Sequence, residues 1–79
     1  MFDYNKLRGR IKEKIGPESK FAEKLNISTT TLSYKFNGNS DFTATEIFKA
    51  CQKEVLDIEP ELIGIYFFTP KLELNSRNN

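Results

Sequence analysis

The sequence contains no histidine and only one cysteine, Cys51. Without histidine the chain lacks the most common general base, and one cysteine can form neither an internal disulfide bond nor a Cys/His zinc site. There is no glycine-rich phosphate loop, and no pair of carboxylates stands out from ordinary surface charge. We therefore expect a protein that is not an enzyme and that uses no cofactor, no metal and no small-molecule substrate. Cys51 is expected to be a small core residue rather than a reactive thiol.

Long hydrophobic runs are also absent. The longest apolar segment, residues 63–68, is far shorter than the roughly 20 residues of a membrane-spanning helix, and Met1-Phe2-Asp3 does not begin a signal peptide. We expect a cytoplasmic protein with no membrane partner. With 79 residues, of which 38% are hydrophobic, the chain is suited to one small domain stabilised by packing alone.

The net charge is only +1, but the charge is distributed unevenly. Residues 1–40 carry eight basic and four acidic side chains, whereas residues 41–79 carry four basic and seven acidic ones. A nucleic-acid partner requires a basic surface, which only the first half could provide. Because surface helices are often charged, this asymmetry is meaningful only if a binding element lies in the basic half.

The spacing of apolar residues predicts an all-α fold with five helices. In chain order, they are expected at residues 4–14, 18–25, 29–36 and 44–54, with a brief fifth helix that has Pro60 in its first turn and ends near residues 64–66. The domain should span residues 1–68, and residues 69–79 should form a C-terminal tail. In and beside that tail, an extended segment is predicted from Phe67, Phe68, Leu72 and Leu74, followed by disorder at Asn75–Asn79.

Polar residues mark the ends of these helices. Asp3 and Ser28 are suited to cap the first and third helices, and Thr43 with Glu46 matches a capping box at the start of the fourth. Residues 37–38, Asn-Gly, should close the third helix.

Two packing predictions follow from the same pattern. Gly9, inside the first helix, should permit another helix to approach closely. The fourth helix should bury a stripe made of Ile47, Phe48, Cys51 and Val55.

Residues 18–38 are the most informative unit, because they form two short helices joined by a three-residue turn. The apolar side chains expected to face inward are Phe21, Ala22, Leu25, Ile27, Leu32 and Phe36. The small Ala22 would lie where two helices cross closely. This is the arrangement of a helix-turn-helix, whose second helix enters the DNA major groove. An ordinary helical hairpin would have the same apolar positions.

The outward face of the second helix of this unit favours DNA. With Leu32 and Phe36 facing the core, the exposed positions are Thr29, Thr30, Ser33 and Tyr34. Solvated faces usually consist of Glu and Lys, whereas Thr and Ser can contact base edges. The exposed tyrosine could contact a base step, a phosphate or another protein. Residues at the rim, where phosphates would lie, are Lys20, Lys35, Asn37 and Asn39.

Residues 19–28, SKFAEKLNIS, together with Thr31-Leu32-Ser33 and Phe36-Asn37-Gly38, resemble the lambda-repressor-like helix-turn-helix family. Within that family the chain is similar to the small Cro-type and repressor-type proteins of temperate phages that infect Gram-positive bacteria. Residues 2–11 and 66–68 share the similarity, so it covers about residues 2–68.

The resemblance implies a compact five-helix DNA-binding domain whose third helix reads a short operator in the major groove. It implies base contacts from Thr29, Thr30 and Tyr34, and phosphate contacts from Ser33, Lys35, Asn37, Ser19 and Lys20. It further implies a homodimeric transcriptional repressor that binds double-stranded DNA in the cytoplasm of a bacterial host and decides between lytic and lysogenic expression.

The chain departs from the family pattern at two positions. Asn26 replaces the usual glycine of the turn, which is tolerable because asparagine accepts the left-handed conformation. Glu18 replaces the usual glutamine at the start of the second helix, and its charge repels phosphate. This second departure supports an alternative function, that of an antirepressor or modulator that binds the DNA-binding domain of a partner phage repressor.

Overall fold

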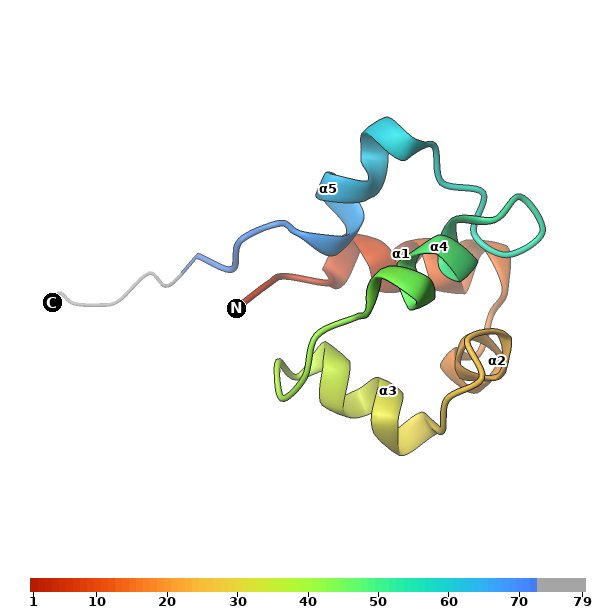
Figure 1. Ribbon diagram of the computed structural model, residues 1–79, viewed down its shortest axis with the longest axis horizontal. Helices are drawn as coiled ribbons and strands as arrows, with labels where there is room; N and C mark the ends of the chain where they lie inside the picture. The colour runs from red at the N-terminus through yellow and green to blue at the C-terminus, as the bar shows by residue number, and fades with distance from the viewer. Residues whose placement is uncertain (73–79) are drawn as a thin grey trace, which may run out of the picture.

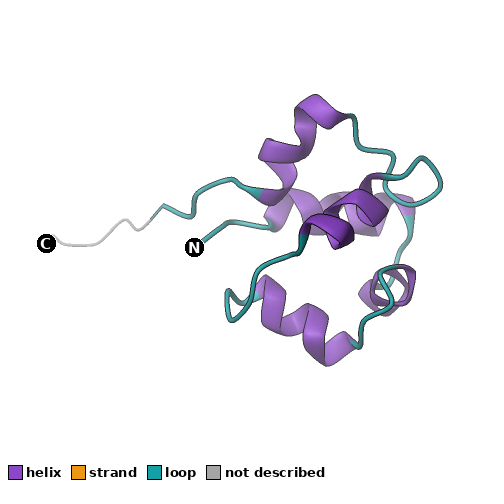
Figure 2. Cartoon of the chain, viewed as in Figure 1, coloured by secondary structure: helices purple, strands orange, loops and turns teal. Residues whose placement is uncertain are grey.

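The computed structural model describes residues 1–72, and this part of the chain folds into five α-helices and one short 3₁₀ helix (Figures 1 and 2). The elements are α1 (Asn5–Lys14), α2 (Glu18–Lys24), α3 (Thr29–Phe36), α4 (Ala44–Cys51), η1 (Pro60–Leu62) and α5 (Ile63–Phe67). Within residues 1–72 there is no strand, only an isolated antiparallel bridge between Phe2 and Pro70. The all-α prediction and the number of helices are therefore confirmed.

Helix α1 lies at the centre of the domain. It contacts α2 on one side and α5 on the other, while α3 packs on α2 and α4 crosses in front of α1 in the view of Figure 1. The core between these helices consists of Tyr4, Leu7, Ile11, Phe21, Ala22, Leu25, Leu32, Phe42, Ala50, Leu56, Ile58 and Phe67. No helix in residues 1–72 is long and apolar enough to cross a membrane.

Two of the predicted caps form as expected. The hydroxyl of Ser28 accepts a hydrogen bond of 3.0 Å from the backbone N–H of Thr31. Thr43 and Glu46 form a reciprocal capping box, with bonds of 3.1 Å and 2.9 Å between side chain and backbone. The first helix differs, because Tyr4 occupies its N-cap position and Asp3 accepts from the backbone N–H of Asn5 one residue outside the cap.

Helix α4 is shorter than predicted, since it ends at Cys51 rather than at residue 54. The chain then turns, and the Leu56 N–H donates back to the Ala50 carbonyl at 3.0 Å. The Arg10 guanidinium holds this turn by donating to the Leu56 and Asp57 carbonyls, both at 2.9 Å. These tertiary bonds give hydrogen-bond partners to backbone groups of the turn, which lie beyond the end of α4.

One packing prediction is wrong in part and the other entirely. Of the predicted α4 stripe, Ile47, Cys51 and Val55 pack partly buried against the core, but Phe48 is 70% exposed, and Ala50 is the fully buried residue of α4. Residues 47, 50 and 51 share one helix face because they are spaced by three and four, whereas residue 48 is turned from residue 47 by about 100°. Gly9 has no close neighbour from another helix, because a Cβ atom built there would meet nothing within 4 Å.

The two ends of the described chain lie side by side. The Asp3 N–H donates to the Thr69 carbonyl at 2.8 Å, and the Lys71 N–H donates to the Met1 carbonyl at 3.0 Å. Phe67 is buried at the end of α5 rather than extended, because it packs edge-on against Phe42 in the core. Phe68 and Leu72 of the predicted extended segment are exposed and lie in no strand. Its last residue, Leu74, and the predicted disorder at residues 75–79 lie outside the described residues.

Candidate nucleic-acid interface

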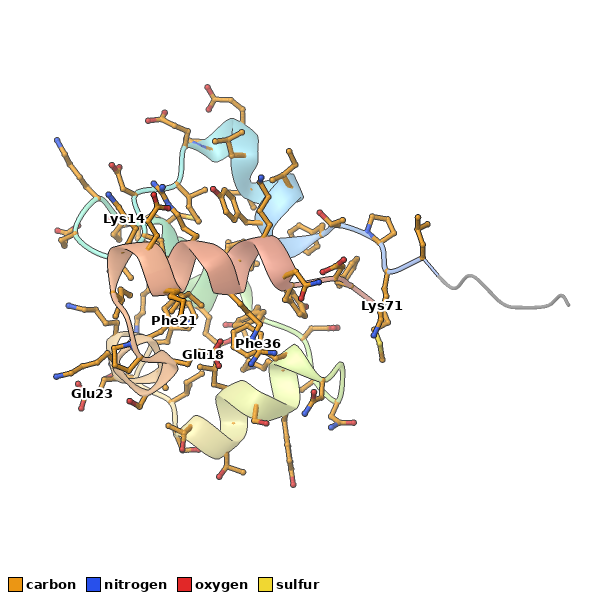
Figure 3. The ribbon with its side chains drawn as sticks, turned by 180° about the vertical axis from the view of Figure 1, so that it is seen from behind. Lys14, Glu18, Phe21, Glu23, Phe36 and Lys71 are labelled. Carbon is orange, nitrogen blue, oxygen red and sulfur yellow. The ribbon has the colours of Figure 1, made fainter. Side chains whose placement is uncertain are left out.

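The connection between α2 and α3 is tightly constructed. Asn26 adopts the left-handed conformation with φ of 60°, which asparagine tolerates better than most residues, and the Ile27 N–H then donates to the Ala22 carbonyl at 3.0 Å. Ala22 is only 1% exposed. Of the other residues predicted to face inward, Phe21, Leu25 and Leu32 are buried, whereas Ile27 and Phe36 are partly buried against the core. In Figure 3, Phe21 and Phe36 lie between α1 and the α2–α3 pair.

The outer face of α3 is polar and carries no charge. Thr29, Thr30, Ser33 and Tyr34 are all exposed, and the Tyr34 side chain is 56% accessible. The helix contains one charged residue, Lys35, and that residue is buried. Because an ordinary solvated helix carries exposed Lys or Glu, a face of hydroxyl groups is better suited to hydrogen bonding with a partner.

Lys35 corrects the predicted set of phosphate-contacting residues. The residue is 5% exposed, and its ammonium group donates to the Asp41 carbonyl at 2.8 Å. It also forms an ion pair of 3.0 Å with Glu46 Oε1 and lies 5.8 Å from the centre of the Phe42 ring. The side chain therefore joins α3 to the start of α4 and is unavailable to an external phosphate. Sequence spacing predicted a rim position, but the long side chain reaches from α3 to Asp41 and Glu46 instead.

The Lys35–Glu46 pair predicts an acid-sensitive step in stability. Burial raises the pKa of the Glu46 carboxyl, but bonds from the Thr43 backbone and from Lys35 outweigh burial, so that the pKa lies below its ordinary value of 4.5. A carboxyl with a lowered folded-state pKa stabilises the fold above about pH 4.5, and this stabilisation is lost as the pH falls through the folded-state value. We expect the free energy of unfolding to fall over this acid range in urea titrations. Glu46→Gln should flatten the slope there, whereas the same change at the exposed Glu54 should leave it steep.

The other predicted rim residues are accessible, and so is Ser19, which the resemblance implies as a phosphate contact. Ser19, Lys20, Asn37 and Asn39 are exposed at the start of α2 and at the end of α3. The Asn37 side-chain amide lies 3.5 Å from the Ser33 hydroxyl, to which it donates a long hydrogen bond. Gly38 has φ of 82° and ends α3, so that the chain turns away from the exposed face after Asn37.

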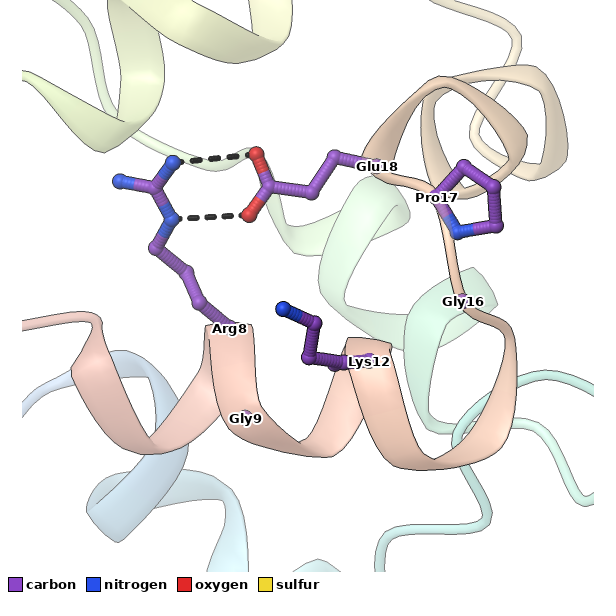
Figure 4. A pocket seen from close by; sticks show the side chains of 6 residues that line it. All are labelled: Arg8, Gly9, Lys12, Gly16, Pro17 and Glu18. Atoms are coloured by element: carbon purple, nitrogen blue, oxygen red, sulfur yellow. Dashed lines mark hydrogen bonds and ion pairs between the residues drawn. The ribbon is translucent and has the colours of Figure 1, made fainter.

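Glu18, at the start of α2, forms an ion pair with Arg8. Its two carboxylate oxygens accept hydrogen bonds from Arg8 of α1, at 2.8 Å from Nε and 3.0 Å from the terminal nitrogen (Figure 4). The Arg8 guanidinium also stacks over the Phe36 ring, with 4.5 Å between the Cζ atom and the ring centre. The sequence gives no periodic signal for this pair, because Glu18 lies ten positions after Arg8 and on a different helix.

Arg8 and Glu18 also border the hollow between α2 and α3. This hollow has a volume of about 120 Å³ and is lined by polar groups from three helices, among them Ser19, Ser33 and Asn37.

The Cys51 thiol is half-buried at the end of α4, away from this surface. Burial raises the pKa of the thiol, which disfavours a reactive thiolate.

The described chain is thus a small all-helical domain with a polar, hydroxyl-rich surface centred on α3. A family model described as "Protein of unknown function (DUF739)" matches residues 1–70, and the chain belongs to the DUF739 family. No curated protein matches the sequence.

Proposed function

We propose that the protein is a sequence-specific DNA-binding transcriptional regulator. In this proposal α2, the turn at residues 25–28 and α3 form a helix-turn-helix, and α3 enters the major groove. The observation that carries the proposal is the α3 face, where every exposed side chain is uncharged and all of them can form hydrogen bonds.

The positions on α3 fit distinct contacts with DNA. Thr29 and Thr30 lie in the first turn, which approaches base edges when a recognition helix lies in the major groove. A threonine hydroxyl can bond to a base edge, and its methyl group can contact the methyl of thymine. Tyr34 lies one turn further along and extends the same face. The flanking residues Ser19, Lys20, Ser33 and Asn37 are exposed, and in this proposal they contact the phosphate backbone.

The resemblance to Cro-type and repressor-type phage proteins gives this regulator its biological setting. We infer a homodimer that binds two half-sites of a short operator in the bacterial cytoplasm and represses transcription. Two-fold symmetry would be matched by a palindromic operator whose half-sites are about one helical turn apart.

Thr30→Ala and Tyr34→Ala test the base contacts directly. Each substitution is expected to weaken specific binding by about 1 to 3 kcal/mol, because it removes a side chain that would contact a base. The melting temperature should stay close to the wild-type value, since both side chains are exposed. The measurement is a gel shift on the intergenic DNA upstream of the protein's own gene.

Helix α4 offers matched controls for both substitutions. Thr45→Ala and Phe48→Ala change the same kinds of residue at exposed positions away from α3, and operator affinity should be unchanged. If both α3 variants bind the operator as tightly as the wild type, α3 is not the reading helix.

A second function, antirepression, is favoured by the Arg8–Glu18 pair. The pair cancels two charges beside α3, and the whole chain has a net charge of only +1, so the surface is less basic than DNA binding usually requires. Such a surface would suit the DNA-binding domain of a partner repressor. The gel shift should therefore be repeated with the partner phage repressor, the one encoded beside this protein's gene. A modulator would be identified if this protein releases the repressor from DNA but does not bind the DNA on its own.

A further inference from the structure

Arg8 lines three surface hollows at once. One, of about 510 Å³, lies between α1 and the start of α2 beside Lys12, and another is the hollow of about 120 Å³ between α2 and α3. The third, of about 200 Å³, extends to Asn37 and Lys71. Arg8 thus stands at the border of the proposed DNA-binding face, although it belongs to α1.

The contact between Arg8 and Glu18 has the geometry with which arginine also binds phosphate. Two N–H groups on one edge of the guanidinium donate to the two carboxylate oxygens, at 2.8 Å and 3.0 Å (Figure 4). A phosphate diester presents two non-bridging oxygens to the same edge, and arginine binds either anion in this bidentate manner. Both partners are partly accessible, with 48% and 37% of their side-chain areas exposed, so an external anion can reach the pair.

We propose that Arg8 is a phosphate-binding residue of the DNA-binding surface and that Glu18 is an internal competitor which occupies it in the free protein. This inference rests on the proposed function. The DNA phosphate displaces the Glu18 carboxylate and takes its two hydrogen bonds, while Ser19, Ser33 and Asn37, which border the same hollow, provide further donors.

Stacking on Phe36 explains how Arg8 can change partner without losing its position. The ring lies 4.5 Å from the guanidinium carbon and is itself partly buried against the core. It supports the guanidinium in the absence of either anion. Among residues 1–72, the acceptors found for the guanidinium are the two oxygens of Glu18. The remaining N–H donors of the guanidinium are therefore available for an oxygen of a second phosphate.

The competition makes a quantitative prediction for Glu18→Gln. Removing the carboxylate charge frees Arg8, so affinity for the operator should rise about tenfold at low salt, where screening is weak. The affinity should also depend more steeply on salt, with the slope of log K against log salt increasing in magnitude by about 0.9, because Glu18 no longer offsets the positive charge that Arg8 brings to one phosphate. The melting temperature should change little, because the pair is exposed.

Two further variants separate this inference from a general effect of charge. Glu23→Gln removes the same charge from an exposed position on the same helix, where Figure 3 shows the side chain directed away from α1 and α3. It should raise affinity less than twofold and leave the salt slope unchanged. Arg8→Met keeps the apolar stem but removes the guanidinium, and combining it with Glu18→Gln should abolish the tenfold gain.

The outcomes distinguish this inference from the proposed function. The role of Arg8 is overturned if Glu18→Gln and Glu23→Gln bind the operator with equal affinity, or if the gain from Glu18→Gln persists in the Arg8→Met background. In either case the proposed function still stands as long as the wild-type protein binds the operator. If neither the wild type nor any variant binds operator DNA, while each has a wild-type melting transition, the proposed function fails and the phosphate site fails with it.

Discussion

Replacing Lys35 with methionine is expected to lower the free energy of unfolding by about 3 kcal/mol. The substitution leaves the Glu46 carboxylate without its buried cation, and it removes the hydrogen bond to the Asp41 carbonyl. Breaking a buried ion pair from one side typically costs about 3 to 5 kcal/mol, because the other charge stays desolvated. Urea denaturation of the two proteins measures this difference.

A second substitution identifies the stranded charge as the cause. Adding Glu46→Gln to Lys35→Met should recover most of the loss, since glutamine has no charge to strand and its amide oxygen can still accept from the Thr43 N–H. Lys53→Met, at an exposed position in the turn after α4, should change stability by less than about 0.5 kcal/mol. If Lys35→Met were as stable as the wild type but bound DNA less tightly, Lys35 would be a phosphate ligand after all.

Ala22→Leu is expected to unfold the domain or leave it only marginally stable. Ala22 is 1% exposed on α2, which packs against both α1 and α3, so three added carbon atoms have no space. Overpacking costs about 1 to 3 kcal/mol and sometimes more. The core of a domain this small rarely provides more than about 3 to 5 kcal/mol of stability. Circular dichroism during thermal melting measures the effect.

The control for Ala22 is another alanine of the same domain. Ala44→Leu adds the same atoms at the exposed first residue of α4, and the melting temperature should stay near the wild-type value. A folded Ala22→Leu variant with an unchanged melting temperature would mean that α2 packs in a different register.

Local sequence signals predicted α3 completely, with bounds at residues 29 and 36. They did so because each end is fixed by neighbouring residues: Ser28 caps the first turn, and Gly38 takes the left-handed conformation after the last. Helix periodicity then divided the helix into buried Leu32 and an exposed face with Thr30 and Tyr34.

Local signals failed where a distant residue decides the outcome. The end of α4 at Cys51 depends on a turn whose carbonyls accept from Arg10, more than 40 residues earlier in the chain. No pattern near residue 51 encodes that bond. Phe42, Leu56 and Ile58 are also core residues that no helix period predicts, because they lie in connections between helices.

By itself the sequence determined the presence of five helices, the caps at Ser28 and Thr43 and the uncharged face of α3, because these depend on residues within one or two turns of one another. Only the tertiary structure decided the state of the charges around that face. It turned Lys35 inward to Glu46, and it brought Arg8 of α1 onto Glu18 of α2. The physical reason is that long charged side chains reach across helices, so their partners are set by how the helices pack rather than by their spacing along the chain.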